Sequence, residues 1–143
     1  MPRRGKKIRD KKLTHSNKRI KEPNTKITGS DTNKYPAFNL TYLAKGYGLD
    51  ECEPKEKLAL LDTFRKLCSL TWGQIRQSGR KGSGSEIIPQ NQLNIPLPKN
   101  ITPEQNILAF RFSGRAPMLG YKDGLTLYII AIDRVFTAYD HGS

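Results

Sequence analysis

The chain has 143 residues, of which 36% are hydrophobic, and its formal net charge at pH 7 is +12. This length fits one small domain with a tail. No stretch reaches the roughly 18 consecutive apolar residues that cross a bilayer, and the N-terminus lacks the apolar run of a secretory signal. We therefore expect a soluble, cytoplasmic protein without a membrane partner.

The positive charge is concentrated at the N-terminus. Residues 1–34 hold 12 Lys and Arg against 3 acids, a net +9, whereas residues 35–143 hold 13 against 10, a net +3. Because the first segment has few apolar side chains to offset the entropy of ordering, we expect a disordered basic tail over 1–34 and one domain over 35–143. The tail residues predicted to bind nucleic acid are Arg3, Arg4, Lys6, Lys7, Lys11, Lys12, Lys18 and Arg19. Such a charge attracts polyanions, so RNA is the expected partner.

Two helices are predicted in the first half of the domain. Pro54 marks the start of the first, and its apolar positions predict a helix over 56–68 packed on the sheet. These positions are Leu58, Leu61, Phe64, Leu67 and Cys68. Thr71 and Gln74 have capping-box spacing, which predicts a second short helix from Trp72 to about Gln77 with Trp72 in the core.

The two cysteines, Cys52 and Cys68, lie 16 residues apart without a companion Cys or His nearby. This spacing argues against a zinc site or a disulfide framework, and Cys68 is expected to be buried as a small apolar residue. No metal and no cofactor are predicted.

A Gly-, Ser-, Asn- and Pro-rich segment over about 78–106 predicts a mobile loop. Arg80 and Lys81 lie in it, either as solvated side chains or as cations that close over a phosphate. Glu86 is the only acid between Asp62 and Glu104, and this isolation makes it a candidate general base.

The last third predicts an antiparallel meander. Alternation puts Leu108, Phe110 and Phe112 on one face and Arg111 on the other. Asp123-Gly124 predicts a two-residue hairpin turn that pairs Tyr121 with Thr126 and Leu119 with Tyr128. The apolar run 127–132 is typical of a central strand.

A final strand over Val135–Tyr139 and an extended segment near 35–43 complete the prediction. The expected fold class is α+β, with two helices packed on a three- to four-stranded antiparallel sheet.

The motifs "FRFSG", "GYKDG", "YIIAID" and "AYDH", in this order after two helices, resemble the RelE/ParE-type toxin superfamily. "LCSLTWGQI", "GSEIIP" and "AIDRVFTAYDHG" resemble a family of small bacterial proteins related to those toxins. The resemblance covers about residues 36–143. It implies a metal-independent endoribonuclease, acting on free RNA or on the ribosome, with an antitoxin protein as a further partner.

The resemblance also implies which side chains surround the scissile phosphate. Arg111, Tyr121 and His141 are the expected catalytic counterparts, together with Glu86 from the loop. Arg115 and Lys122 join Arg80 and Lys81 as expected phosphate-binding cations. His141 is the only side chain outside the tail whose ordinary pKa lies near neutrality.

Ordinary structural roles stand beside these functional ones. Arg111 and Lys122 also suit solvated strand positions, and Tyr121 also suits a half-buried strand aromatic. Three functions stay open: a toxin-like endoribonuclease, a non-catalytic nucleic-acid-binding module, and a protein-interaction domain in a defence or counter-defence system.

Overall fold

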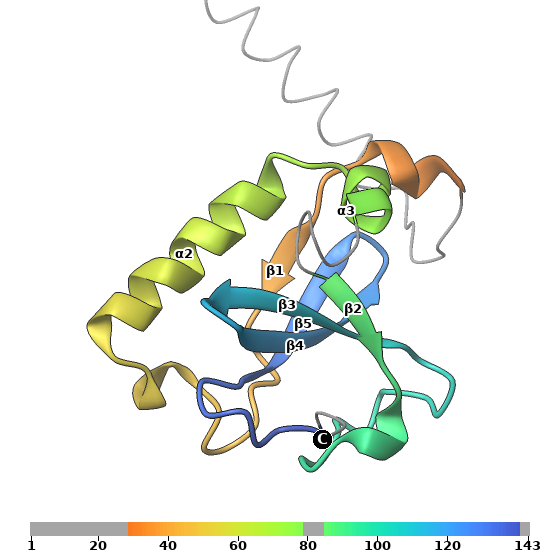
Figure 1. The fold of residues 1–143 in the computed structure, drawn as a ribbon. Coiled ribbons are helices and arrows are strands. Elements are labelled where there is room, and N and C mark those ends of the chain that lie inside the picture. The colour runs from red at the N-terminus through yellow and green to blue at the C-terminus, as the bar shows by residue number, and fades with distance from the viewer. Residues whose placement is uncertain (1–28, 79–84, 141–143) are drawn as a thin grey trace, which may run out of the picture.

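Two α-helices pack on one face of a five-stranded sheet in the computed structural model, which describes residues 29–78 and 85–140 (Figure 1). The helices are α2 (Pro54–Cys68) and α3 (Trp72–Ser78). The strands are β1 (Ala37–Asn39), β2 (Ser85–Ile88), β3 (Ile107–Ser113), β4 (Ala116–Asp123) and β5 (Thr126–Ile132). Three short 3-10 helices in this part of the chain are η1 (Gly29–Asn33), η2 (Leu49–Glu51) and η3 (Gln90–Gln92). The predicted α+β class is confirmed.

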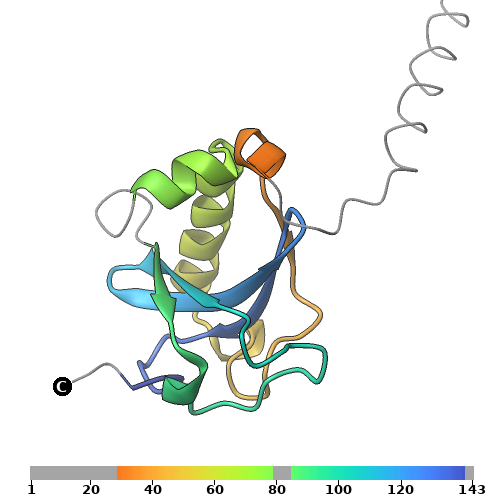
Figure 2. The same cartoon turned by 90° about the vertical axis from the view of Figure 1, so that its right-hand side faces the viewer.

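Local signals define both α-helices. The Glu53 side chain accepts a hydrogen bond from the Glu56 backbone at the start of α2, and the Glu56 side chain accepts one from the Glu53 N–H. Thr71 and Gln74 form the predicted capping box at α3, with Thr71 N–H donating to Gln74 Oε1 at 2.9 Å. Figure 2 shows α3 crossing near the C-terminal end of α2.

The sheet order is β1-β5-β4-β3-β2. β1 pairs with β5 in parallel, with Ala37 opposite Thr126, while the other three pairings are antiparallel. The prediction of a purely antiparallel sheet of three or four strands is therefore wrong. A parallel strand pair needs a long crossover connection, so no short turn motif in the sequence indicates the pairing of β1 with β5.

The β4–β5 hairpin exists, but its register differs from the prediction. Asp123 pairs with Thr126 and Tyr121 with Tyr128, so the connecting residues are Gly124 and Leu125. Gly124 has a φ of 64°, which glycine adopts at little cost. A register shift between Leu119 and Gly120 also changes the pairing at the start of β4, where Leu119 lies opposite Ala131.

Both faces of the sheet are buried. Phe110, Met118 and Leu127 belong to the core beneath the helices, and Ala109, Leu119 and Ile130 belong to a second core on the opposite face. The predicted alternation of β3 and the central position of β5 are confirmed. Segments of irregular backbone cover the second core; for example, Ala44 N–H donates to Ile130 O at 2.8 Å.

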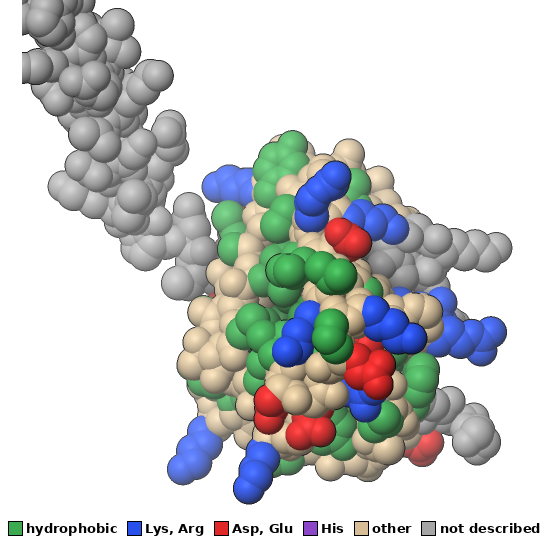
Figure 3. Space-filling view, turned by 90° about the vertical axis from the view of Figure 1, so that its left-hand side faces the viewer, with side chains coloured by type: hydrophobic (Ala, Val, Ile, Leu, Met, Phe, Trp, Pro, Cys, Tyr) green, Lys and Arg blue, Asp and Glu red, His purple; other side chains and the backbone are tan. Residues whose placement is uncertain are grey.

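The apolar face that α2 buries matches the prediction at Phe64 and Leu67 but differs from it at the other positions. Leu60 and Leu67 are buried, whereas Leu58 and Leu61 are 64% and 61% exposed and Cys68 is also exposed. α2 carries leucines on two faces, and tertiary packing selects the face of Leu60. Figure 3 views the α2 side of the molecule, where hydrophobic side chains alternate with charged ones.

Two connecting regions also depart from expectation. β2 and η3 occupy part of the segment predicted as a loop over 78–106, because β2 pairs with β3 and places Glu86 opposite Ala109. The predicted strand over Val135–Tyr139 is absent: Phe136 has a φ of 64°, and only Tyr139 forms an isolated bridge, to Leu93.

Candidate functional site

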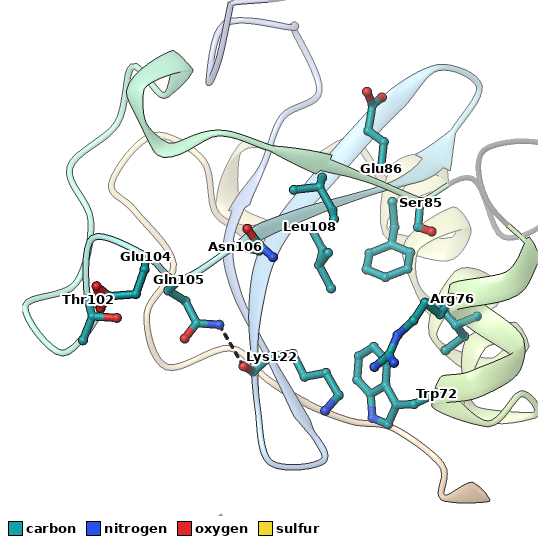
Figure 4. A pocket seen from close by; sticks show the side chains of 13 residues that line it. Trp72, Arg76, Ser85, Glu86, Thr102, Glu104, Gln105, Asn106, Leu108 and Lys122 are labelled. Carbon is teal, nitrogen blue, oxygen red and sulfur yellow. Dashed lines mark hydrogen bonds between the residues drawn. The ribbon is translucent and has the colours of Figure 1, made fainter. Parts of the chain in front are cut away.

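A cavity of about 650 Å³ opens between α3, the edge strand β2, the centre of the sheet and the segment 102–106 (Figure 4). The apolar residues of its wall are Trp72, Ile75, Ile87, Leu108 and Phe110. The polar residues are Arg76, Ser85, Glu86, Thr102, Glu104, Gln105, Asn106 and Lys122. We refer to this cavity as the α3–β4 pocket.

Lys122 is the most unusual residue of the pocket. It follows Met118 and Gly120 on the helix-facing side of β4, where a charged side chain enters an otherwise apolar core. Its side chain is 8% exposed, and its Nζ lies 3.7 Å from Asp31 Oδ2 and 5.1 Å from the centre of the Trp72 ring. Within the described part of the chain, this Nζ has no hydrogen-bond partner.

Burial lowers the pKa of Lys122, and the positive charge of Arg76 lowers it further, while Asp31 opposes the shift. Removing an ammonium from water disfavours its charged form, and the ion pair with Asp31 compensates only in part. An anion in the pocket would supply the missing compensation.

Trp72 and Asp31 are held in place by backbone contacts. Trp72 Nε1 donates to Leu125 O at 3.1 Å, and Trp72 N–H donates to Lys34 O at 2.8 Å. A Cβ at Gly73 would lie 2.8 Å from Thr32 O, so only glycine lets η1 approach α3 this closely. This contact places Asp31 against Lys122.

Arg76 supplies a second cation one helical turn after Trp72. Figure 4 shows the Arg76 side chain alongside the Trp72 indole and the Lys122 side chain reaching toward the same indole from β4. Arg76 is exposed to solvent, whereas Lys122 lies at the buried end. The pocket therefore has one cation at depth and one at its mouth.

The segment 102–106 forms the polar wall, and hydrogen bonds fix it. Gln90 Nε2 donates to Thr102 O at 2.8 Å and to Gln105 O at 2.6 Å. Gln105 Nε2 donates to Lys122 O at 3.1 Å, as the dashed line in Figure 4 marks. The wall that faces the cations is therefore part of the folded framework.

Glu86 does not point toward the cations. It pairs with Ala109, which belongs to the opposite core, while its neighbours Ser85 and Ile87 pair with residues of the helix-facing side. Figure 4 shows the Glu86 carboxylate directed away from Trp72 and Lys122. The position of Glu86 gives no support to its expected role as a base in this pocket.

Arg111 and Tyr121 are separated. Arg111 is exposed opposite Pro117, and Tyr121 lies four residues further along β4, about 13 Å away. Arg115 is exposed in the turn after Ser113, near Arg111. The structure thus brings the two arginines to one end of the hairpin and leaves Tyr121 at the other.

Tyr121 belongs to the face opposite the α3–β4 pocket. It is 3% exposed, its hydroxyl accepts a hydrogen bond from Asn100 Nδ2 at 2.9 Å, and its ring stacks on Tyr128 at 5.1 Å. Burial raises the pKa of Tyr121, which keeps the phenol protonated. These contacts describe a packed strand aromatic.

Other predicted site residues lie outside the described residues. They are His141, Arg80, Lys81 and the tail residues Arg3, Arg4, Lys6, Lys7, Lys11, Lys12, Lys18 and Arg19. Of the predicted catalytic group Arg111, Tyr121 and His141, the described residues therefore include only Arg111 and Tyr121.

Asp31 and Arg76 were not predicted as site residues, whereas Lys122 was predicted as a phosphate-binding cation. One signal was available for Lys122, since alternation along 118–122 puts it on the same side as Met118. No comparable signal exists for Asp31, because its contact with Lys122 joins residues 91 positions apart.

Comparison of the chain with protein-family models, with curated proteins and with solved structures finds no match. In the described part of the chain, no helix is both long and apolar enough to cross a membrane. The fold and the pocket define an α+β domain with a cavity lined by two cations, Arg76 and Lys122, and two carboxylates, Glu86 and Glu104.

Proposed function

We propose that the chain is a cytoplasmic RNA-binding protein, in which the basic N-terminal segment attracts the polyanion and the α3–β4 pocket engages it. The observation that carries this proposal is the presence of two cations, Lys122 and Arg76, on the wall of one cavity. Phosphate is the anion that RNA offers at every residue, and Lys and Arg are its usual protein partners.

The N-terminal segment and the pocket have different tasks in this proposal. The net +9 of residues 1–34 favours polyanions through counterion release, which depends on salt and not on sequence. A buried ammonium in a shaped cavity instead acts at one position of the RNA.

A salt titration tests the proposal. Fluorescence anisotropy would measure the affinity for a labelled single-stranded RNA at several KCl concentrations. We expect that replacing the eight tail residues predicted to bind nucleic acid by Gln in the full chain makes the plot of log affinity against log salt shallower by several units. Absence of RNA binding by the parent protein would exclude the proposal, and an unchanged slope would exclude a role for the tail.

The second candidate function is metal-independent RNA cleavage, as in a RelE-like toxin. The pair of cations on the pocket wall favours it, because Lys122 and Arg76 would stabilise the negative charge that builds up on the scissile phosphate. Lys122 replaces the separated pair Arg111 and Tyr121 as the centre of this hypothesis.

Incubation of the protein with RNA in EDTA, alone and with ribosomes, distinguishes the two functions. Fragments that appear in EDTA and are lost on Lys122→Met favour cleavage in the pocket, whereas loss on His141→Ala favours the C-terminal histidine. Retained binding without fragments favours the non-catalytic module.

For a partner protein such as an antitoxin, we propose the exposed face of α2 as the binding surface. The exposed Leu58 and Leu61 form an apolar strip with no covering element in the described residues. Figure 3 views the side of the molecule on which α2 lies. Leu61→Lys should weaken binding of such a partner while leaving RNA affinity unchanged.

A further inference from the structure

We propose that the α3–β4 pocket binds one unpaired nucleotide, with its phosphate between Lys122 and Arg76 and its base against the apolar wall and segment 102–106. This inference rests on the proposed RNA-binding function and names the ligand of its site. The shared chemistry is a nucleoside monophosphate, either free or within a single strand.

The size of the pocket selects this class. A volume of about 650 Å³ falls within the range of about 300–1,000 Å³ that holds one small organic ligand, and a nucleotide is such a ligand. A base within a duplex is stacked and paired, and enters a pocket of this kind only after extrusion. The pocket therefore favours single-stranded RNA over duplex.

Lys122 gives the phosphate end its specificity. Its ammonium has three donors, and the distance of 3.7 Å to Asp31 Oδ2 satisfies none of them as a hydrogen bond. Asp31 and the Trp72 ring hold the ammonium from behind, so Asp31 acts as a positioning residue. A phosphate oxygen is the strong acceptor that this buried donor lacks.

The opposite wall has the chemistry of a base site. Ile87 and Leu108 offer apolar surface to the faces of a base. Thr102, Glu104 and Asn106 offer donors and acceptors to its edges, on a segment fixed by Gln90. Inorganic phosphate would use only the cationic end, which distinguishes a nucleotide site from a plain anion site.

Trp72 provides a built-in reporter, because it is the only tryptophan of the chain and it lines the pocket. We would titrate the full-length protein with AMP, GMP, CMP and UMP and follow Trp72 emission, corrected for nucleotide absorbance. Adenosine and inorganic phosphate serve as the two half-ligands. A short single-stranded RNA and its matched duplex serve as the chain-bound forms.

At least one monophosphate and the single-stranded RNA should change the emission saturably. Adenosine, inorganic phosphate and the duplex should bind at least about tenfold more weakly, because each lacks part of the contact set or withholds its bases.

Arg76→Gln is the main variant, since Arg76 is exposed and its loss does not open the core. It should weaken binding of the responding monophosphate about tenfold, as expected for one charge-assisted contact. Arg65→Gln is the matched control, because Arg65 is also an exposed helical arginine but does not line the pocket. Its affinity should equal that of the parent. Lys122→Arg keeps the charge, and Lys122→Met removes it, with the unfolding transition measured for both.

Three results would overturn the inference: no saturable emission change with any monophosphate or single strand, equal binding of inorganic phosphate and nucleotide, or equal effects of Arg76→Gln and Arg65→Gln. If these occur while anisotropy still reports RNA binding, RNA binding through the basic N-terminal segment stands and the pocket assignment fails. If monophosphates bind but RNA does not, the pocket is a site for free nucleotides and the RNA proposal fails.

Discussion

The two faces of the sheet are covered in different ways, and adjacent residues of β4 show the consequence. Lys122 faces the helices and lines a cavity, whereas Tyr121 faces the opposite side and is packed among aromatic rings. The helix-covered face uses α2 and the short α3, which leave space beside the edge strand β2. The loop-covered face is closed by irregular segments that follow the sheet closely, with backbone bonds such as Ile132 N–H to Tyr47 O at 2.8 Å.

This difference teaches where a ligand site forms in a small domain. Regular helices meet a sheet along narrow apolar strips, so gaps remain where a short helix ends. Loops adapt to the surface and seal it, but they depend on individual polar contacts.

On the helix-covered face, Leu60→Ala should have the largest effect on stability. Leu60 is 2% exposed, and truncation of a buried leucine costs about 2–5 kcal/mol of unfolding free energy. Leu61→Ala is the control on the same helix, since its side chain is 61% exposed, and it should change stability by no more than about 0.5 kcal/mol. Urea unfolding of both variants measures the difference, and a larger loss for Leu61→Ala than for Leu60→Ala would place the other face of α2 on the sheet.

On the loop-covered face, Asp133 should be the most sensitive polar residue. Its Oδ1 accepts from Thr137 N–H at 2.8 Å and its Oδ2 from Ala138 N–H at 3.0 Å, and the residue is fully buried. Asp133→Ala leaves these donors without their acceptor and should cost about 2–3 kcal/mol. Asp133→Asn retains one carbonyl oxygen and should cost less, so an equal loss in both variants would mean that charge, not hydrogen bonding, matters.

Tyr121→Phe should produce a smaller loss, about 1 kcal/mol, because Asn100 loses its acceptor while the stacked ring remains. Burial raises the folded-state pKa of Tyr121 above the unfolded value, so its contribution is complete below about pH 10 and is lost as the pH rises further. Urea midpoints of the parent and Tyr121→Phe should therefore converge in alkali. A constant difference would contradict the assigned burial of the hydroxyl.

The smallest effect is expected where the two layers meet. Arg134 Nε donates to Glu56 Oε1 at 2.7 Å, which lowers the pKa of Glu56, with the hydrogen bond from the Glu53 backbone as a second cause. A lowered folded-state pKa stabilises the fold above the unfolded pKa of about 4.3 and ceases to do so as the pH falls through the folded value. The difference in urea midpoint between the parent and Glu56→Gln should thus be small at pH 7 and vanish in acid, below the lowered folded-state pKa of Glu56. Arg134→Gln should show the same pH dependence, and a difference that persists in acid would argue against this ion pair.

Local chemistry made part of the fold predictable from the sequence. The capping box of Thr71 and Gln74 marks α3, Pro54 begins α2, and the alternation around Phe110 defines the two sides of β3. These features depend on residues a few positions apart, whose spacing follows directly from helix and strand geometry. The burial of Trp72 follows from its place between two joined helices.

Long-range pairing decided the rest. β1 pairs with β5 although the paired residues Ala37 and Thr126 are 89 positions apart. β2 pairs with β3 although β2 lies in a segment whose composition is typical of a loop. α2 carries two apolar faces, and only contact with the sheet selects Leu60 over Leu61. The site follows the same rule: alternation gives Lys122 its side of β4, but Asp31 and Arg76 reach it from separate elements, because folding alone brings such distant charges together.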